Sequence, residues 1–277
     1  MIKKSDFGKV ITFYSYKGGT GRTMALANVA YLLSQRDGIK KGVLMIDWDL
    51  EAPGLHRYFE KYALIEDQKP GLINLFTEFQ HILAKRKDSI SEKSFQELMV
   101  DMQFRNKFLV PIDFNNLFLL KAGRWDEQYS TLVNTFNWEE FYTNFPKFFS
   151  EFANYLARQF DYILIDSRTS LTDIGGICTM IMPEVLVAVF TPNKQSIKGV
   201  QQLITEAVRY RGQTDDLRTL TVFPLPSRVE TEVETLLNLW RFGSDKDGIV
   251  GYQTEFENLF KKLHKLELCD LEKYFNR

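Results

Sequence analysis

The apolar positions of this chain gather in short, near-continuous runs, which alternate with longer stretches where apolar residues recur every three or four positions. Runs of the first kind predict strands buried on both faces, and stretches of the second kind predict amphipathic helices. The predicted strands cover residues 10–14, 42–46, 116–123, 160–165, 185–190 and 220–229. This alternation predicts an α/β fold with a mostly parallel, doubly wound sheet flanked by helices.

The segment between the predicted strands 42–46 and 160–165, at about residues 57–150, predicts a helical elaboration within a single domain of residues 1–277. Helices are expected over 71–87 and 91–102, and an aromatic stripe at helical spacing follows, with a bend at Pro146. The stripe comprises Phe141, Phe145, Phe148, Phe149, Phe152, Leu156 and Phe160. A partner surface is one interpretation, but core packing is the prediction, because helical apolar stripes usually face the interior.

A glycine-rich loop follows the first predicted strand and leads into a predicted helix over residues 24–33. The loop reads Tyr16-Lys17-Gly18-Gly19-Thr20-Gly21-Arg22-Thr23. Its glycines allow positive φ angles that turn successive N–H groups toward phosphate oxygens, and the helix adds its positive N-terminal end. This context predicts a P-loop, with Thr23 placed to bind Mg²⁺. Two irregularities are Arg22, which replaces the usual lysine, and the additional cation Lys17.

Acidic residues follow two further predicted strands. Asp166 ends the run 160–165, which is the Walker B arrangement, so we expect it to hold Mg²⁺ directly or through water. Asp47 and Asp49 follow the run 42–46 and either point to opposite sides or swing to one side where the strand ends. Asp173, in the loop 167–176, is expected to be a loop or helix N-cap residue rather than a functional acid.

The loop Lys17–Thr23 resembles the deviant Walker A motif of ParA/MinD ATPases, K-G-G-x-G-K-[ST], except at Arg22. The strand and acids at 160–167 and the stretch after Asp47 resemble the Walker B strand and switch I of that family. The resemblance implies that Lys17 reaches across a homodimer interface to nucleotide held by the other subunit. It also implies that Asp49 orients the attacking water, with Asp47 near Mg²⁺ and Thr23.

These considerations define the expected site. The catalytic residues would be Asp49 and Lys17. Nucleotide contacts are expected from Lys17, Gly18, Gly19, Thr20, Gly21, Arg22, Thr23, Met24, Pro224, Pro226, Ser227 and Arg228. The last four are included because the resemblance implies that loops after the late strands surround adenine, although their prolines are equally consistent with rigid turns. The expected metal ligands are Thr23, Asp47 and Asp166, and the cofactors are ATP and Mg²⁺.

Arginine at position 22 keeps the positive charge and can bind phosphate through two donors, but it is larger than an ammonium group and is not an equivalent point charge. We therefore expect ATP binding to survive more readily than fast hydrolysis. A branch of the family with K-G-G-x-G-R-T and I-D-W-D-L-E-A-P-G-L resembles nearly the whole chain. Its members often occur in bacterial conflict and phage-defence gene clusters.

The function implied is a Mg·ATP-dependent dimerising switch that slowly hydrolyses ATP and controls a protein partner in such a system. The alternative is a nucleotide-binding structural subunit of a larger defence complex that does not hydrolyse ATP. Plasmid partition ranks lower, because 35 Lys and Arg against 36 Asp and Glu leave a net charge of −1 and no basic field for nucleic acid.

The remaining features bear on location and on the C-terminus. Cys178 and Cys269 are widely separated and indicate neither a metal site nor a disulfide framework, and with no run of transmembrane length they favour a cytoplasmic protein. The apolar face from Phe256 to Leu271 invites a membrane-binding interpretation, but its acidic residues cancel most of its basic charge. We expect this helix to pack on the domain or on a partner. His56 is expected to be a surface loop residue.

Overall fold

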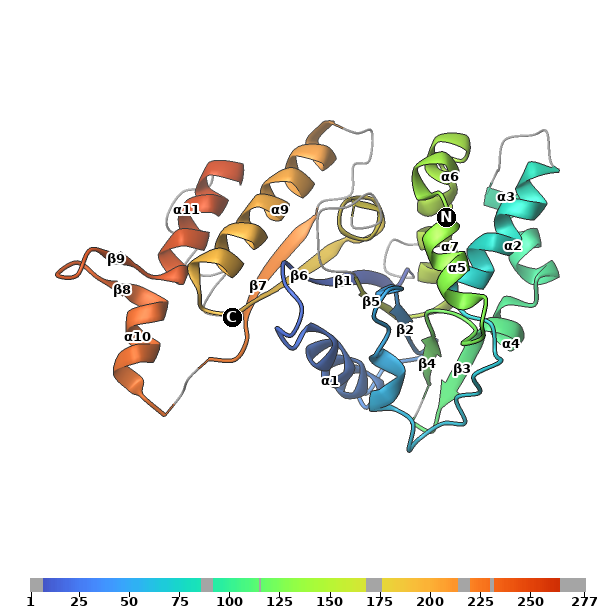
Figure 1. Ribbon diagram of the computed structural model, residues 1–277, viewed down its shortest axis with the longest axis horizontal. Helices are drawn as coiled ribbons and strands as arrows, with labels where there is room; N and C mark the ends of the chain where they lie inside the picture. The colour runs from blue at the N-terminus through green and yellow to red at the C-terminus, as the bar shows by residue number, and fades with distance from the viewer. Residues whose placement is uncertain are drawn as a thin grey trace.

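A central β-sheet with helices on both faces makes up the protein (Figure 1). The computed structural model describes residues 7–85, 92–114, 116–167, 176–213, 220–229 and 232–264. The strands within these ranges are β1 (Lys9–Ser15), β2 (Val43–Asp47), β3 (Leu109–Ile112), β4 (Leu117–Leu120), β5 (Tyr162–Asp166), β6 (Val185–Phe190), β7 (Thr221–Pro226), β8 (Gly243–Ser244) and β9 (Ile249–Val250). The helices are α1 (Arg22–Ser34), α2 (Leu72–Ala84), α3 (Glu92–Asp101), α4 (Phe104–Phe108), α5 (Tyr129–Thr135), α6 (Trp138–Asn144), α7 (Phe148–Gln159), α9 (Lys194–Gln213), α10 (Glu234–Phe242) and α11 (Tyr252–His264), with the short η2 (Leu55–Tyr58) and the π-helix η3 (Ile177–Ile181).

Strand pairing in the described chain gives a seven-stranded sheet in the order β3-β4-β2-β5-β1-β6-β7. All pairs are parallel except β3 with β4. The predicted parallel, doubly wound α/β sheet is therefore confirmed. Its register places Asp47 opposite Asp166 at the carboxyl ends of β2 and β5. Ligands of open parallel sheets bind outside this edge, so the predicted site residues on β1, β2 and β5 converge there.

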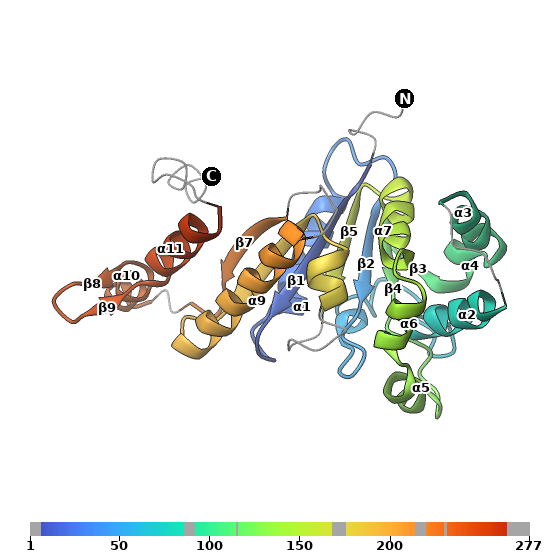
Figure 2. The ribbon, with the colours of Figure 1, turned by 90° about the horizontal axis from the view of Figure 1, so that it is seen from above.

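The two faces of the sheet are buried by different helices. Helix α1 and η2 pack on one face, where Leu26 and Ala30 meet strand residues such as Met45. Helices α2 and α7 pack on the other face, and α9 and α11 cover β6 and β7 beside them. Seen from above, α7 and α9 lie over the strands while α2, α3 and α4 form a layer at the β3 side (Figure 2). The near-continuous apolar strands are thus explained, because both of their faces are covered.

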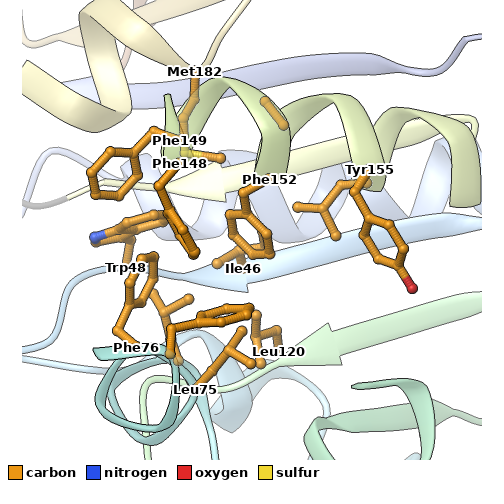
Figure 3. Close-up of a cluster of buried hydrophobic side chains, with 14 of the residues drawn as sticks. Ile46, Trp48, Leu75, Phe76, Leu120, Phe148, Phe149, Phe152, Tyr155 and Met182 are labelled. Atoms are coloured by element: carbon orange, nitrogen blue, oxygen red, sulfur yellow. The ribbon is translucent and has the colours of Figure 1, made fainter. Parts of the chain in front are cut away.

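The predicted aromatic stripe packs in the core, as expected. Pro146 separates α6 from α7 and so produces the predicted bend. From α7, Phe148, Phe149 and Phe152 point toward Phe76 of α2 (Figure 3). Trp48 joins them from the segment after β2, residues 48–58. The Phe76 ring lies 5.6 Å from that of Phe148 and 5.4 Å from that of Trp48. The helical elaboration therefore shares its core with the segment that follows β2.

The C-terminal helix α11 packs on the body of the protein. Phe256 and Phe260 are buried, and the Phe256 ring lies 5.0 Å from that of Phe190 on β6. This agrees with the prediction for the part of the apolar face that is described; Leu266 and Leu271 lie outside the described residues. Helix α10, by contrast, buries none of its residues. Among the described residues, no helix is both long and apolar enough to cross a membrane.

Candidate functional site

The loop between β1 and α1 has the open, glycine-dependent shape of a phosphate cradle. Gly19 and Gly21 have φ angles of +73° and +89°, and a Cβ atom at Gly18 or Gly19 would meet nothing within 4 Å. The Ser15 hydroxyl donates to the carbonyl of Lys17 at 2.9 Å and braces the start of the loop. Gly21 then caps α1 in the left-handed conformation, which glycine adopts without steric cost.

A cavity of about 580 Å³ opens over this loop. It is lined by Ser15, Gly18, Gly19, Thr20, Gly21, Arg22, Thr23, Met24, Asp49, Glu51, Ala52, Tyr58 and Arg228. The structure thus brings most of the predicted P-loop residues together with Asp49 and Arg228. Glu51, Ala52 and Tyr58 were not among the predicted site residues; Glu51 and Ala52 belong to the stretch that resembles switch I, and Tyr58 follows it in η2.

Arg22 lies at the base of the cavity between two of the predicted acids. Its Nε donates to Asp166 Oδ1 at 2.5 Å and its Nη2 donates to Asp49 Oδ2 at 2.7 Å. The side chain is only 6% exposed, and Nη1 is buried with no hydrogen-bond partner in the described structure. Burial alone would lower the Arg22 pKa, but the charges of Asp166 and Asp49 outweigh it, so the pKa is raised. Arg22 therefore remains charged and neutralises both carboxylates.

The two buried acids at the ends of β2 and β5 differ in their partners. Burial raises the pKa of Asp166, against the lowering effects of Arg22 and of a hydrogen bond from Thr23. Burial also raises the pKa of Asp47 well above its ordinary value, and the charge of Asp166 adds to this. Asp47 Oδ2 accepts the backbone N–H groups of Gly54 and Leu55, each at 3.1 Å. Asp47 thus ties the segment after β2 back to its strand.

Lys17 lies on the exposed rim of the loop and does not line the cavity. Its Nζ donates to Oε1 of Gln195 at the start of α9. The ammonium group is therefore held on the outer side of the phosphate loop. This placement leaves the predicted contact with the nucleotide of another subunit as a prediction.

The four residues predicted near adenine form two pairs, one within β7 and one directly after it. Pro224 and Pro226 lie within β7 and do not line the cavity; β7 is an edge strand, where proline is tolerated because its missing N–H faces away from the ladder. Ser227 and Arg228 follow the strand at its carboxyl end. The Ser227 hydroxyl oxygen would lie 3.1 Å from a Cβ atom at Gly21, so this turn touches the phosphate loop.

Near the segment after β2, one residue was predicted wrongly from the sequence and another was missed. His56 is 9% exposed, with its ring 4.1 Å from that of Trp125, so the prediction of a surface residue is wrong. Tyr129 of α5 donates its hydroxyl to the carbonyl of Leu50 at 2.7 Å. These two partners are 79 positions apart in the sequence, so no local pattern revealed the contact. Of the loop 167–176, Asp173 and its neighbours 168–175 lie outside the described residues.

The residues present fit Mg²⁺ together with a triphosphate. The buried Thr20 hydroxyl and Arg22 Nη1 have no partner in the described structure, and both belong to the cradle. In the described residues, no group of three or more His, Cys, Asp or Glu could hold a metal alone. Mg²⁺ is typically bound by one or two carboxylates plus substrate phosphates, so Thr23 and Asp166, two of the expected ligands, would hold it together with bound phosphate.

Comparisons with known proteins agree with this fold. Residues 8–217 match the family described as an AAA domain. A putative plasmid partition protein from Borrelia burgdorferi B31, bound to AMPPNP, is 20% identical, with 97% of this chain and 96% of that chain covered and a TM-score of 0.56. McdA from Cyanothece in complex with ATP is 18% identical, with 94% and 98% covered and a TM-score of 0.54. The septum site-determining protein MinD of Pyrococcus horikoshii OT3, complexed with Mg-ADP, is 18% identical, with 82% and 72% covered and a TM-score of 0.50. The sequence has no match among curated proteins.

Proposed function

Because the chain belongs to the AAA domain family and has the fold of ParA/MinD-like ATPases, we propose that it is a Mg·ATP-dependent switch that dimerises, hydrolyses ATP slowly and controls a protein partner. The observation that carries this proposal is the position of Arg22. At the base of an open phosphate cradle, its guanidinium joins the acid proposed to orient water, Asp49, to the acid proposed to hold Mg²⁺, Asp166.

Phosphate binding is supported by the free donors of the cradle. The glycine backbone is open to the cavity, and the buried Thr20 hydroxyl and Arg22 Nη1 lack partners in the described structure. Leaving buried donors unpaired is unfavourable by about 1–3 kcal/mol each. A triphosphate would relieve this penalty at both groups, while the N-terminus of α1 adds a favourable dipole.

For hydrolysis, we assign separate tasks to the acids. Thr23 and Asp166 would hold Mg²⁺, which supplies charge stabilisation at the β- and γ-phosphates when bound. Asp49 faces the cavity from the segment after β2 and would orient the attacking water once Arg22 turns from it toward phosphate. Asp47 keeps this segment folded through Gly54 and Leu55. Slow turnover follows from the two ion pairs of Arg22, because Asp49 is engaged until they rearrange.

Dimerisation is proposed from the family resemblance and from the exposed position of Lys17. A protein partner is proposed on the same basis, with bacterial conflict or phage defence as its context. The named relatives differ in what they do, since they include a plasmid partition protein and a septum site-determining protein, so the partner of this chain is a matter for experiment.

The alternative function, a nucleotide-binding subunit that does not hydrolyse ATP, is favoured by the same Asp49–Arg22 ion pair if that pair persists with nucleotide bound. Phosphate release separates the two. Repeated turnover by purified protein with Mg·ATP, abolished in Asp49→Ala while ATP binding is retained, is the result expected for the switch. Stoichiometric nucleotide binding without phosphate release would support the alternative, and Asp49→Ala with wild-type turnover would contradict the role of Asp49.

A further inference from the structure

The segment that follows β2 alternates between the core and the cavity. Trp48 and Leu50 are buried, at 0% and 2% exposure, while the Asp49 side chain faces the cavity with 15% exposure. The Trp48 ring packs on Phe76 of α2, and the backbone N–H of Trp48 donates to the carbonyl of Asp166 at 3.0 Å. The contacts that hold Trp48 and Leu50 in the core therefore determine the direction of the Asp49 carboxylate between them.

Trp48 is held by its packing on Phe76 and by its hydrogen bond to the end of β5, whereas Leu50 is held by a side chain from outside the sheet. The carbonyl of Leu50 accepts the hydroxyl of Tyr129 at 2.7 Å. The chain turns here, with the N–H of Ala52 donating to the carbonyl of Asp49 at 3.2 Å, so Leu50 lies inside the turn that Asp49 begins. The Tyr129 hydroxyl thus fixes the peptide between Leu50 and Glu51, within this turn.

Tyr129 is itself well placed to serve as a fixed donor. It begins α5, and its N–H donates to the carbonyl of Asp126 at 3.1 Å. Its ring packs so closely on Gly123 that a Cβ atom there would lie 2.6 Å from Tyr129 Cε2. Burial, with the charges of Asp47 and Asp49, raises the Tyr129 pKa above its ordinary value. The phenol therefore remains a donor at every pH at which the protein would work.

We propose that Tyr129 is a positioning residue for hydrolysis: by holding the carbonyl of Leu50, its hydroxyl keeps the Asp49 carboxylate directed into the nucleotide cavity. Its effect on hydrolysis rests on the proposed function, in which Asp49 orients the attacking water. This contact connects the helical elaboration to the phosphate site, because Tyr129 is contributed by α5 and Asp49 by the segment after β2. Tyr129 acts through Leu50 and is not expected to touch nucleotide, since it does not line the cavity.

The test compares Tyr129→Phe with the wild-type protein and with Tyr142→Phe. The first variant removes the hydroxyl and keeps the ring. The control removes a hydroxyl of similar exposure on α6, which lies 3.2 Å from that of Tyr210 and away from the cavity residues. We expect phosphate release at saturating Mg·ATP to fall about threefold to tenfold in Tyr129→Phe, the scale of one lost hydrogen bond. Affinity for a nonhydrolysable ATP analogue should change less than twofold.

Amide hydrogen exchange of nucleotide-free protein supplies a readout that is independent of turnover. Exchange at residues 48–54 should be several-fold faster in Tyr129→Phe and unchanged in Tyr142→Phe. Wild-type turnover in Tyr129→Phe, or equal losses in analogue affinity and in turnover, would overturn the positioning role. If the wild-type protein releases no phosphate, the proposed function fails; faster exchange would then still support the anchoring of the segment, and unchanged exchange would overturn it.

Discussion

At the scale of single residues, the site places three aspartates around one buried arginine. Besides burial, the charges of Asp166 and Asp49 raise the pKa of Asp47, and the charge of Asp49 raises that of Asp166, while Arg22 pairs with Asp49 and Asp166. Arginine suits this position because its planar fork offers separate donors to Asp49 and Asp166 at the same time. A lysine ammonium is a single point charge, so it would hold the two acids less firmly as a pair.

Substitutions of Arg22 test whether its guanidinium binds phosphate and whether it restrains Asp49. Arg22→Ala should weaken ATP affinity by about 10- to 100-fold, because a charge-assisted phosphate contact is lost. Arg22→Lys should retain ATP binding and hydrolyse ATP at an equal or higher rate, since Asp49 is released more readily. Nucleotide titration and phosphate release measure the two effects. Unchanged ATP affinity in Arg22→Ala would mean that Arg22 serves only the two acids.

The lowered pKa of His56 predicts that the stability of the folded protein depends on pH. Burial lowers its pKa below 6.5, opposed by Glu60 and assisted by Arg57. Just below pH 6.5 the unfolded chain therefore binds a proton that the folded chain does not, and the free energy of unfolding falls as the pH is lowered through this window. Lowering the pH from 7.5 to 5.5 should destabilise the wild-type protein more than His56→Gln, as measured by urea midpoints. His81→Gln, at an exposed position on α2, is the control; a wild-type response in His56→Gln would contradict the prediction.

At the scale of elements, the sequence predicted the parallel strands well, because the central ones are continuous apolar runs buried on both faces; the edge strand β7 is only partly covered, with Phe223 46% exposed. The strand β3 (Leu109–Ile112) was not predicted: it is short, contains Pro111, and pairs antiparallel at the edge of the sheet, where proline is tolerated. The P-loop context was also readable, and the predicted ParA/MinD-like fold is confirmed. Contacts between distant segments, such as Tyr129 with Leu50, carried no periodic signal and required the structure.

Helix α2 places Phe76 in the core, together with its other buried residues, Leu72, Ile73, Leu75, Phe79 and Leu83. The Phe76 ring lies among Trp48, Phe148 and Phe149 (Figure 3). Phe76→Ala should lower the free energy of unfolding by about 3–5 kcal/mol, because a large cavity forms among rings that cannot all close over it. Denaturant unfolding measures this, with Leu64→Ala, 81% exposed, as the control. A loss similar to that of the control would show that the cluster repacks freely.

At the scale of the whole molecule, the phosphate loop lies at the carboxyl edge of the sheet, between the α1 face and the start of α9 (Figure 1). Lys17 and Gln195 bring the loop and α9 together on the outer rim of this edge. Arg22 and the acids occupy the inner side. The inner residues are therefore equipped to bind nucleotide within one chain, while Lys17 is exposed to whatever approaches that edge from outside.

This separation predicts different effects of Lys17 on binding and on association. Lys17→Ala should weaken ATP-dependent dimerisation by about tenfold or more, because it would remove the proposed charge-assisted contact to the nucleotide of the other subunit. Nucleotide binding to the monomer should change little, since Lys17 does not line the cavity. Sedimentation velocity with and without a nonhydrolysable ATP analogue tests this, with Lys198→Ala, at an exposed position further along α9, as the matched control. Equal dimerisation of Lys17→Ala and wild type would reduce Lys17 to a loop lysine held by Gln195, and a wild-type protein that stays monomeric with the analogue would contradict the proposed dimer itself.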